Sequence, residues 1–542
     1  MGAPRKQAWP TVAIFATVLL AISFSANIAA SLHYGRLAQP PSYDDISYLS
    51  DALQRFLFDP GRGLSSVISS FLANPPHAPL STLTALSGFW LFGPWTVAPY
   101  LANAWILAVF VLTIAAVSRK IEDTVQRVLF ITLFLFAPVA HAMVNEFRPD
   151  MAAGLLFGIA LYAICTVDLS STAVSRRLWL GVLAALATIA KPSAMIVTIP
   201  FLGLAGCSAI FLNARKPGQS LLQAVKQASP AIAVYAGIIT LFLVVWGKTT
   251  YAYIYQALIS NADIWSTPGS PIFHGIYHSF GAGGTKALGP FLVGPFICLW
   301  DAIILFRDRR SNPGAAGILT VYSLLVLLYA GMAMSNEKTV FQGSLFYLPL
   351  IICTAHALAR RIRAANGAGR ATPTRAILGV CVCLLVFFAP FASSYTKAQQ
   401  DRLQISRLLD DVTLRIAQTR STASEACRRK SYTIVTTNPD PLSPNLIAYQ
   451  AALQGIELRE SSTFFARDLA VAEGALSQAD FVFTPDANAP ILSRRLPGAA
   501  FVDALNARLA SDPDWTMEKI GEFSGYPMFL AIRKCENSLG PG

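Results

Sequence analysis

The sequence predicts an α-helical polytopic membrane protein that carries a C-terminal extracytoplasmic α/β domain. The chain of 542 residues has a mean hydropathy of +0.49, with 54% hydrophobic and 13% charged residues. Apolar runs long enough to cross a bilayer recur up to about residue 392, and the sequence then turns polar. Lys and Arg residues gather in alternate short loops, which is the positive-inside pattern of multi-pass proteins.

About eleven transmembrane helices are predicted from the apolar runs. They cover residues 10–32, 96–117, 124–143, 150–168, 178–190, 194–212, 229–247, 288–306, 317–333, 341–358 and 376–392. The loops with paired or clustered cations alternate along the chain, so we place the N-terminus in the cytoplasm. The formal charge of +12 then indicates topology rather than a nucleic-acid partner. We also expect the first span to stay uncleaved, because its apolar run is longer than that of a usual signal peptide.

The fifth span is short, since residues 178–190 would extend only about 20 Å as a helix against a bilayer core of about 30 Å. A single helix over 178–212 would place Arg176-Arg177 and Arg215-Lys216 on opposite sides of the membrane. Pro192 disfavours helical geometry at Lys191. We therefore predict two spans that meet in a turn at the outer surface.

Two domains are expected: residues 1–392 in the membrane, with long outer loops at 33–95 and 248–287, and residues 393–542 outside it. Within the second, residues 433–437 and 481–484 have the composition of strands. Residues 445–454 and 467–477 have helical patterns, and such alternation is typical of α/β folds. Two cysteines of this region, Cys427 and Cys535, either form one disulfide or remain unpaired.

The acidic pair Asp44-Asp45 directly follows the first span. Adjacent carboxylates repel one another unless a cation, a metal or a hydrogen-bond donor compensates. One interpretation is a general base with a partner carboxylate that binds a metal or positions a hydroxyl. The other is a solvated turn or a helix N-cap, for which Asp is also suited.

Further charges are expected at the same outer face. Glu146, Arg148 and Asp150 fall between the third and fourth spans, Lys191 lies in the turn after the fifth, and Lys338 lies in a short outer loop. Each also has a structural explanation, either snorkelling or helix capping. Cations at one face suit a phosphate, and carboxylates suit a divalent metal or proton abstraction from a hydroxyl.

The i, i+4 pair His274 and His278 would suit a metal if it were helical. However, Pro271 and Gly275 weaken the helix and no third ligand is evident, so we expect a structural or surface role.

In order and predicted sidedness, these short motifs resemble the multispan glycosyltransferases of the C-type superfold, over roughly residues 10–392. The nearest branch contains protein O-mannosyltransferases and lipid A aminoarabinose transferases. The resemblance depends on the acidic pair after span one, the Arg-Pro-acidic element that opens span four, the Gly181–Pro192 run, and Lys338 ahead of the Tyr347–Leu350 segment. No family resemblance is seen in the C-terminal domain.

The resemblance implies a C-type glycosyltransferase fold and sugar transfer from a polyprenyl-phosphate donor, usually with inversion. The acceptor would be a glycan, a lipid or a protein, and the reaction would occur at the periplasmic face of the bacterial inner membrane. No cofactor is implied with certainty, and a divalent metal ion held by Asp44 and Asp150 is one option.

The resemblance also suggests residue roles. Asp44 matches the first acidic residue of the catalytic loop and is the candidate base, while Asp45 stands where many relatives have Glu. Either Asp150 or Glu146 matches the second carboxylate element. The candidates for holding the donor phosphate are Arg148, Lys191 and Lys338.

Two other classes of function remain open from the sequence. A transporter or flippase of lipid-linked sugars would usually place ionisable residues at mid-membrane and show inverted repeats. A membrane-anchored binding or sensory protein would leave the charges at the outer face unexplained. Neither alternative fits the charge pattern as well as a glycosyltransferase.

Overall fold

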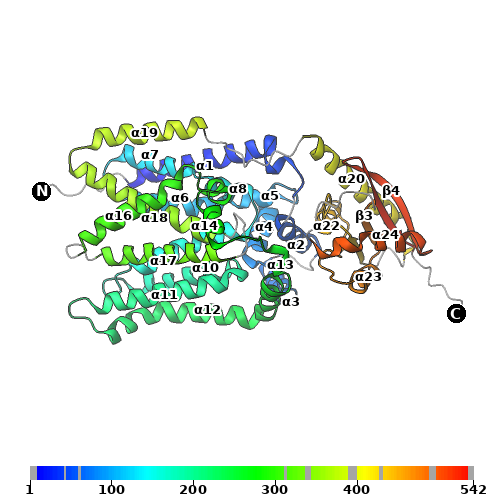
Figure 1. Cartoon of the computed structure of the whole chain (residues 1–542), viewed down its shortest axis with the longest axis horizontal. Coiled ribbons are helices and arrows are strands. Elements are labelled where there is room, and N and C mark those ends of the chain that lie inside the picture. The colour runs from blue at the N-terminus through cyan, green and yellow to red at the C-terminus, as the bar shows by residue number, and fades with distance from the viewer. Residues whose placement is uncertain are drawn as a thin grey trace. The chain divides into compact units, whose positions relative to one another are not determined.

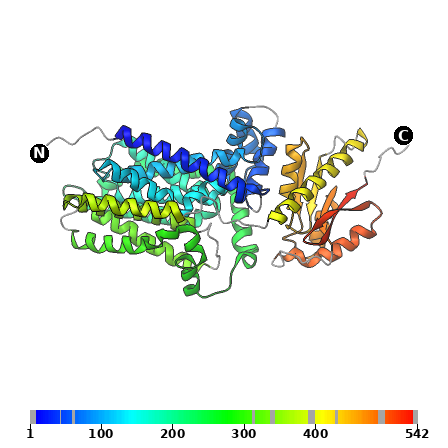
Figure 2. The ribbon, with the colours of Figure 1, turned by 90° about the horizontal axis from the view of Figure 1, so that it is seen from above.

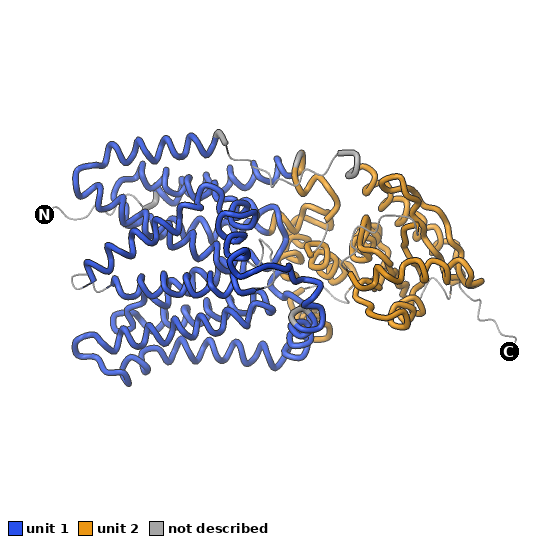
Figure 3. Tube along the Cα trace, in the orientation of Figure 1, with its two compact units in different colours: residues 1–31, 75–81, 103–393 blue, residues 32–74, 82–102, 394–542 orange. Residues whose placement is uncertain are grey.

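The computed structural model describes residues 9–41, 44–58, 63–309, 314–335, 343–388, 399–425, 431–486 and 496–534. The chain divides into two compact units, which Figure 3 distinguishes by colour. Unit 1 comprises residues 1–31, 75–81 and 103–393, and unit 2 comprises residues 32–74, 82–102 and 394–542. The outer loop that carries the acidic pair thus belongs to the same unit as the C-terminal domain.

Long apolar helices make up unit 1, and they run side by side in both views of the ribbon (Figure 1 and Figure 2). They are α1 (Trp9–Tyr34), α6 (Ala104–Ser118), α7 (Thr124–Leu135), α8 (Pro138–Asn145), α9 (Pro149–Thr166), α10 (Val174–Ile189), α11 (Met195–Ala214), α12 (Leu221–Tyr255), α16 (Gly294–Arg307), α17 (Ala315–Met334), α18 (Ser344–Gly367) and α19 (Ala371–Phe388). Three short helices lie between α12 and α16, namely α13 (Ala262–Trp265), α14 (Pro271–His278) and α15 (Ala282–Leu288).

By length and composition, eight of the described helices can cross a membrane, or nine if α7 and α8, bent by 61°, form one span. The chain is therefore a multi-pass membrane protein, with fewer such helices than the eleven predicted. The predicted fifth span is helix α10, but its 16 residues extend only about 24 Å, short of a bilayer core of about 30 Å. The predicted last span is α19, a shorter apolar helix.

The break predicted at Lys191-Pro192 is confirmed. Helix α10 ends at Ile189, Lys191 has extended backbone angles (φ −136°, ψ 97°), and Pro192 opens a short 3₁₀ turn ahead of α11. Arg148 is likewise extended (φ −128°, ψ 143°) because Pro149 follows it. In both places a proline holds the preceding cation outside the helix that begins there.

Helices α9 and α18 pack closely through two glycines. A Cβ atom on Gly154 would lie 2.4 Å from the carbonyl oxygen of Ser344, and one on Gly158 would lie 3.0 Å from the backbone of Pro349. Small residues at i and i+4 let two membrane helices approach to this distance. The hydroxyl of Ser344 donates to the carbonyl oxygen of Asp150 at 2.8 Å, so the packing also fixes the first turn of α9.

Unit 2 contains the predicted α/β domain, whose five strands have the order β2-β1-β3-β5-β4. The strands are β1 (Tyr432–Thr436), β2 (Leu458–Ser462), β3 (Phe481–Pro485), β4 (Trp515–Phe523) and β5 (Tyr526–Arg533). Strand β1 is parallel to β2 and β3, whereas β5 is antiparallel to β3 and β4. Its helices are α20 (Gln399–Thr422), α22 (Pro444–Leu453), α23 (Leu469–Ser477) and α24 (Val502–Ser511).

The strands and helices that the sequence predicts here are confirmed as β1, β3, α22 and α23, each within about two residues of its expected bounds. A core of Val435, Val482 and Ala531 on the strands packs against Leu476 of α23 and Leu505 of α24.

Four further helices of unit 2 come from the outer loop: α2 (Asp44–Phe58), α3 (Leu64–Ala73), α4 (Pro79–Phe92), of which residues 82–92 belong to the unit, and α5 (Ala98–Ala102). Helix α2 packs on α22.

Candidate functional site

The two members of the acidic pair face different surroundings. Asp44 is the first residue of α2 and its side chain is exposed, whereas Asp45 is completely buried. Both carboxylates lie in the first turn of a helix, where the positive end of the helix dipole stabilises negative charge. The adjacent residues can therefore have separate roles.

Asp45 is held by two side chains that come from elsewhere in unit 2. The guanidinium of Arg36, itself 4% exposed, donates through Nη2 to Asp45 Oδ2 at 2.9 Å and through Nε at 3.0 Å. The hydroxyl of Tyr100 donates to the same oxygen at 3.0 Å. These contacts to one buried carboxylate hold the start of α2 in place, and with it the neighbouring residue Asp44.

In unit 1, the predicted residues of the Asn145–Asp150 segment and Lys191 do come together. Lys191 Nζ lies 2.5 Å from Asp150 Oδ1, and Asp150 is 5% exposed. The Nε of Arg148 lies 3.8 Å from Glu146 Oε2, and both side chains are 9% exposed. We call these four residues the charged cluster. The charged cluster thus contains two cations, Arg148 and Lys191, of the kind that bind an anionic ligand.

His77 belongs to the surroundings of the charged cluster, although no sequence motif marks it. Burial and then the charge of Lys191 lower the pKa of His77 to about 4, while Asp150 acts in the opposite direction. The imidazole is therefore neutral at pH 7 and can both donate and accept a hydrogen bond. Its ring lies against that of Tyr253, with centroids 3.6 Å apart.

Asn145 is fully buried at the end of α8, next to Glu146. Among the described residues, neither its amide nitrogen nor its carbonyl oxygen has a hydrogen-bond partner. Leaving such a group unsatisfied costs about 1–3 kcal/mol, so a polar ligand that reached it would gain binding energy.

Lys338 lies outside the described residues, as do Cys427 and Cys535. Within the described part of the chain, no three His, Cys, Asp or Glu side chains converge as metal ligands would. The oxygens of Asp150 and Asp45 described above are engaged by Lys191, Arg36 and Tyr100. We derive no step through a metal, and the metal option stays a prediction.

The predicted structural role of His274 and His278 agrees with their contacts. Contrary to the expected weakness of this helix, α14 forms. His274 Nδ1 contacts the carbonyl oxygen of Ser335, and His278 Nδ1 lies 3.0 Å from the hydroxyl of Tyr347.

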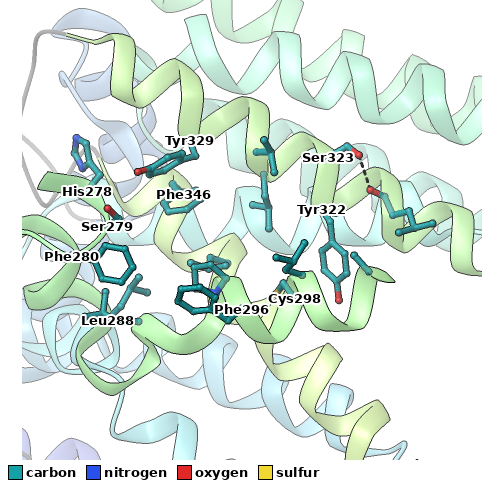
Figure 4. A pocket seen from close by; sticks show the side chains of 18 residues that line it. His278, Ser279, Phe280, Leu288, Phe296, Cys298, Tyr322, Ser323, Tyr329 and Phe346 are labelled. Carbon is teal, nitrogen blue, oxygen red and sulfur yellow. Dashed lines mark hydrogen bonds between the residues drawn. The ribbon is translucent and has the colours of Figure 1, made fainter. Parts of the chain in front are cut away.

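A large apolar pocket lies between α14, α16, α17 and α18, with a volume of about 510 Å³. Figure 4 shows His278 and Ser279 at one end and Tyr322 towards the other. Large apolar side chains on its rim, including Phe296 and Val326, are more than half exposed on unit 1. An open apolar pocket on membrane helices with a polar end fits a lipid chain that carries a polar head.

A second, half-buried carboxylate in unit 2 joins the outer loop to the sheet domain. Glu460 of β2 accepts from Asn445 at 2.6 Å and from Ser50 and Gln54 of α2 at 3.2 Å each. Burial, assisted by the charge of Asp51, raises the pKa of Glu460 to about 7, although the three hydrogen bonds oppose this rise. Helix α2 is thus tied to the sheet by a group that titrates near neutral pH.

This titration predicts a pH dependence of stability. Between pH 4.5 and 7 the folded state holds a proton on Glu460 that the unfolded state lacks. The free energy of unfolding should therefore fall as the pH rises through this window, by up to about 3 kcal/mol (2.5 pH units at 1.36 kcal/mol each), and level off above pH 7. Thermal unfolding of the full chain should show this fall, and Glu460→Gln should flatten it. The exposed variant Glu522→Gln should leave the slope as it is, and equal slopes in all three proteins would contradict the assignment.

No protein-family model matches the chain, and no curated protein matches it. Its structure is similar to that of ArnT from Cupriavidus metallidurans in the apo state, with a TM-score of 0.54 at 12% identity over 96% of this chain and 98% of ArnT. ArnT from the same organism bound to undecaprenyl phosphate gives a TM-score of 0.54 at 10% identity, with the same coverage.

ArnT is a C-type membrane glycosyltransferase, so the fold predicted from the sequence is confirmed. The likeness extends over both the membrane helices and the C-terminal domain, since nearly all of each chain is covered.

Proposed function

We propose that the protein is a glycosyltransferase that moves a sugar from a polyprenyl-phosphate donor to an acceptor hydroxyl, with inversion at the anomeric carbon. One structural relative, ArnT, has been solved with undecaprenyl phosphate, which supports a lipid-linked donor. The acceptor would be a glycan, a lipid or a protein.

The observation that carries the proposal is the position of the first turn of α18. Ser344 of this turn binds the backbone of Asp150 in the charged cluster. Three residues on, the hydroxyl of Tyr347 meets His278, which lies at the polar end of the apolar pocket. Since three residues of helix span only about 4.5 Å, unit 1 presents ion pairs and a lipid-sized apolar pocket next to each other. A prenyl chain would occupy the pocket and its phosphate would meet Arg148 and Lys191.

In the proposed reaction, Asp44 accepts the proton of the acceptor hydroxyl and the hydroxyl oxygen attacks the anomeric carbon. The bond between that carbon and the phosphate oxygen breaks, and its electron pair leaves with the polyprenyl phosphate. The leaving group is already an anion, so cations such as Lys191 and Lys338 stabilise it better than a proton donor would. Asp150 positions Lys191, and Glu146 positions Arg148.

We further propose that transfer occurs at the periplasmic face of the bacterial inner membrane, with the N-terminus in the cytoplasm. This orientation agrees with the cations of the alternate loops. In the proposed division, residues 1–392 bind the donor and residues 393–542 form the periplasmic α/β domain that receives the acceptor.

The test is release of polyprenyl phosphate by the purified full chain in nanodiscs, from a panel of polyprenyl-phosphate sugars with a crude envelope fraction as acceptor. We expect release from one donor and none from the corresponding nucleotide sugars. Absence of release from every donor, with and without divalent metal, would contradict the proposal and favour a transporter of lipid-linked sugars.

A further inference from the structure

A second group of cations lies in unit 1, remote in sequence from the charged cluster. Lys120 follows α6 by two residues, and Arg360, Arg361 and Arg363 lie where the apolar part of α18 ends. We call these four residues the Lys120 cluster. Lys120, Arg360 and Arg361 are partly buried and Arg363 is exposed.

One buried carboxylate forms ion pairs with two members of the Lys120 cluster. Asp301 of α16 is completely buried and lies 2.5 Å from Arg361 Nη2 and 3.4 Å from Arg360 Nη1. The hydroxyl of Tyr322 also donates to it at 3.0 Å. Both oxygens of Asp301 are thus engaged by the arginines, and neither is within ion-pair distance of Lys120.

Lys120 has an imidazole as its partner instead. Its Nζ lies 3.0 Å from Nδ1 of His356, whose ring also contacts the hydroxyl of Tyr162. Within the described part of the chain, Lys120 and Arg363 form no ion pair. Four cations therefore face one carboxylate, and the Lys120 cluster together with Asp301 has a net charge of +3.

The positive charges of neighbouring arginines disfavour the charged form of Lys120. Its pKa is lowered to about 8 by burial and then by the charges of Arg360 and Arg363, against the opposing charge of Asp301. A partly buried ammonium among like charges is stabilised by any anion that enters. The cations come from two separate chain segments, so they offer an oxyanion several positive charges rather than a single ion pair.

The surroundings of the cluster are those of a membrane boundary. Trp300 is 56% exposed, and the guanidinium of Arg361 lies 5.2 Å from the centre of its ring. Leu299 and Ile303, next to it on α16, are also exposed apolar side chains. An exposed Trp beside cations at the end of apolar helices is typical of the headgroup region of a bilayer. A bilayer presents phosphates at this depth, and in an anionic phospholipid the phosphate is not neutralised by a cation of its own headgroup.

We propose that Lys120 and Arg363, together with Arg360, bind the phosphate of an anionic phospholipid in the leaflet that faces the α6–α7 and α18–α19 loops. The site is separate from the proposed transfer reaction and does not depend on it. It lies beside Asp301, the residue that joins α16, α17 and α18 through Arg360, Arg361 and Tyr322, so a bound lipid stabilises the packing of these helices.

The test compares the full chain with Lys120→Met/Arg363→Gln, a double variant that removes two charges without breaking an ion pair. The matched control, Arg176→Gln/Arg309→Gln, removes two exposed charges elsewhere, one in the first turn of α10 and one just after α16. Each protein, delipidated in neutral detergent, is titrated with phosphatidylglycerol, phosphatidylcholine or inorganic phosphate, and the bound lipid is counted by native mass spectrometry alongside thermal unfolding.

We expect phosphatidylglycerol to raise the unfolding temperature of the wild type and of the control, and the double variant to bind it at least about tenfold more weakly. Equal binding of phosphatidylcholine would overturn the proposal, because the anionic head would then be irrelevant. An equal loss of affinity in the control would overturn it in favour of general surface attraction. An equal effect of inorganic phosphate would overturn the assignment to a lipid and indicate a soluble anion.

Discussion

Asp44→Asn should lower the rate of polyprenyl phosphate release by at least about a hundredfold and leave the fold intact. Removing a general base typically costs a factor of 10²–10⁴ in rate. Asp44 is exposed at the start of α2, so an amide of the same shape can replace the carboxylate without leaving a buried group unpaired. The measurement is single-turnover release from the active donor, with thermal unfolding recorded on the same preparation.

The control for this variant is Asp503→Asn. Asp503 is also an exposed Asp in the first turn of a helix of unit 2, α24, so its replacement has the same small effect on the helix dipole. It should release polyprenyl phosphate at the wild-type rate. Normal turnover by Asp44→Asn would remove the base assignment, while loss of activity in both variants would indicate an effect on folding rather than on chemistry.

Features set by local chemistry could be predicted from the sequence. The break at Pro192, the strands β1 and β3 and the helix α22 each follow from composition within a few residues. Helix α14 was expected to be weak, yet it forms because Pro271 occupies its first position, where no N–H is needed, and Ser270 caps it. Gly275 of this helix also receives the Tyr329 hydroxyl on its carbonyl oxygen at 2.8 Å. Such tertiary support is not visible in the sequence.

Long-range contacts account for the part of the site that the sequence did not predict. From the sequence we expect Asp150 and Lys191 to lie at the same outer face. Their ion pair cannot be predicted there, because it depends on how α9, α10 and α11 pack. His77 lies 73 or more residues from either of them, and nothing in its own segment marks it. Nothing in the sequence distinguishes the two carboxylates of the acidic pair. Only the partners Arg36 and Tyr100 distinguish Asp45 from Asp44.

Replacing Arg36, the cation that pairs with Asp45, by Met should lower the free energy of unfolding of unit 2. The change leaves Asp45 buried without its cation, and breaking a buried pair from one side costs about 3–5 kcal/mol. Unit 2 should therefore unfold at a clearly lower temperature and become more sensitive to limited proteolysis. The exposed pair of Arg508 and Glu473, whose side chains are 49% and 35% exposed, provides the comparison within the same unit. Arg508→Met should cost no more than about 1 kcal/mol.

The double variant Arg36→Met/Asp45→Leu separates the cost of an orphaned charge from the value of the pair. Replacing both partners by apolar groups of similar size removes the buried charge, so we expect most of the lost stability to return. The tyrosine hydroxyl of Tyr100 is then left without its acceptor on Asp45, which limits the recovery by about 1–3 kcal/mol. If Arg36→Met were no worse than Arg508→Met, the buried ion pair would not be what stabilises the start of α2, and the structural role assigned to Asp45 would fail.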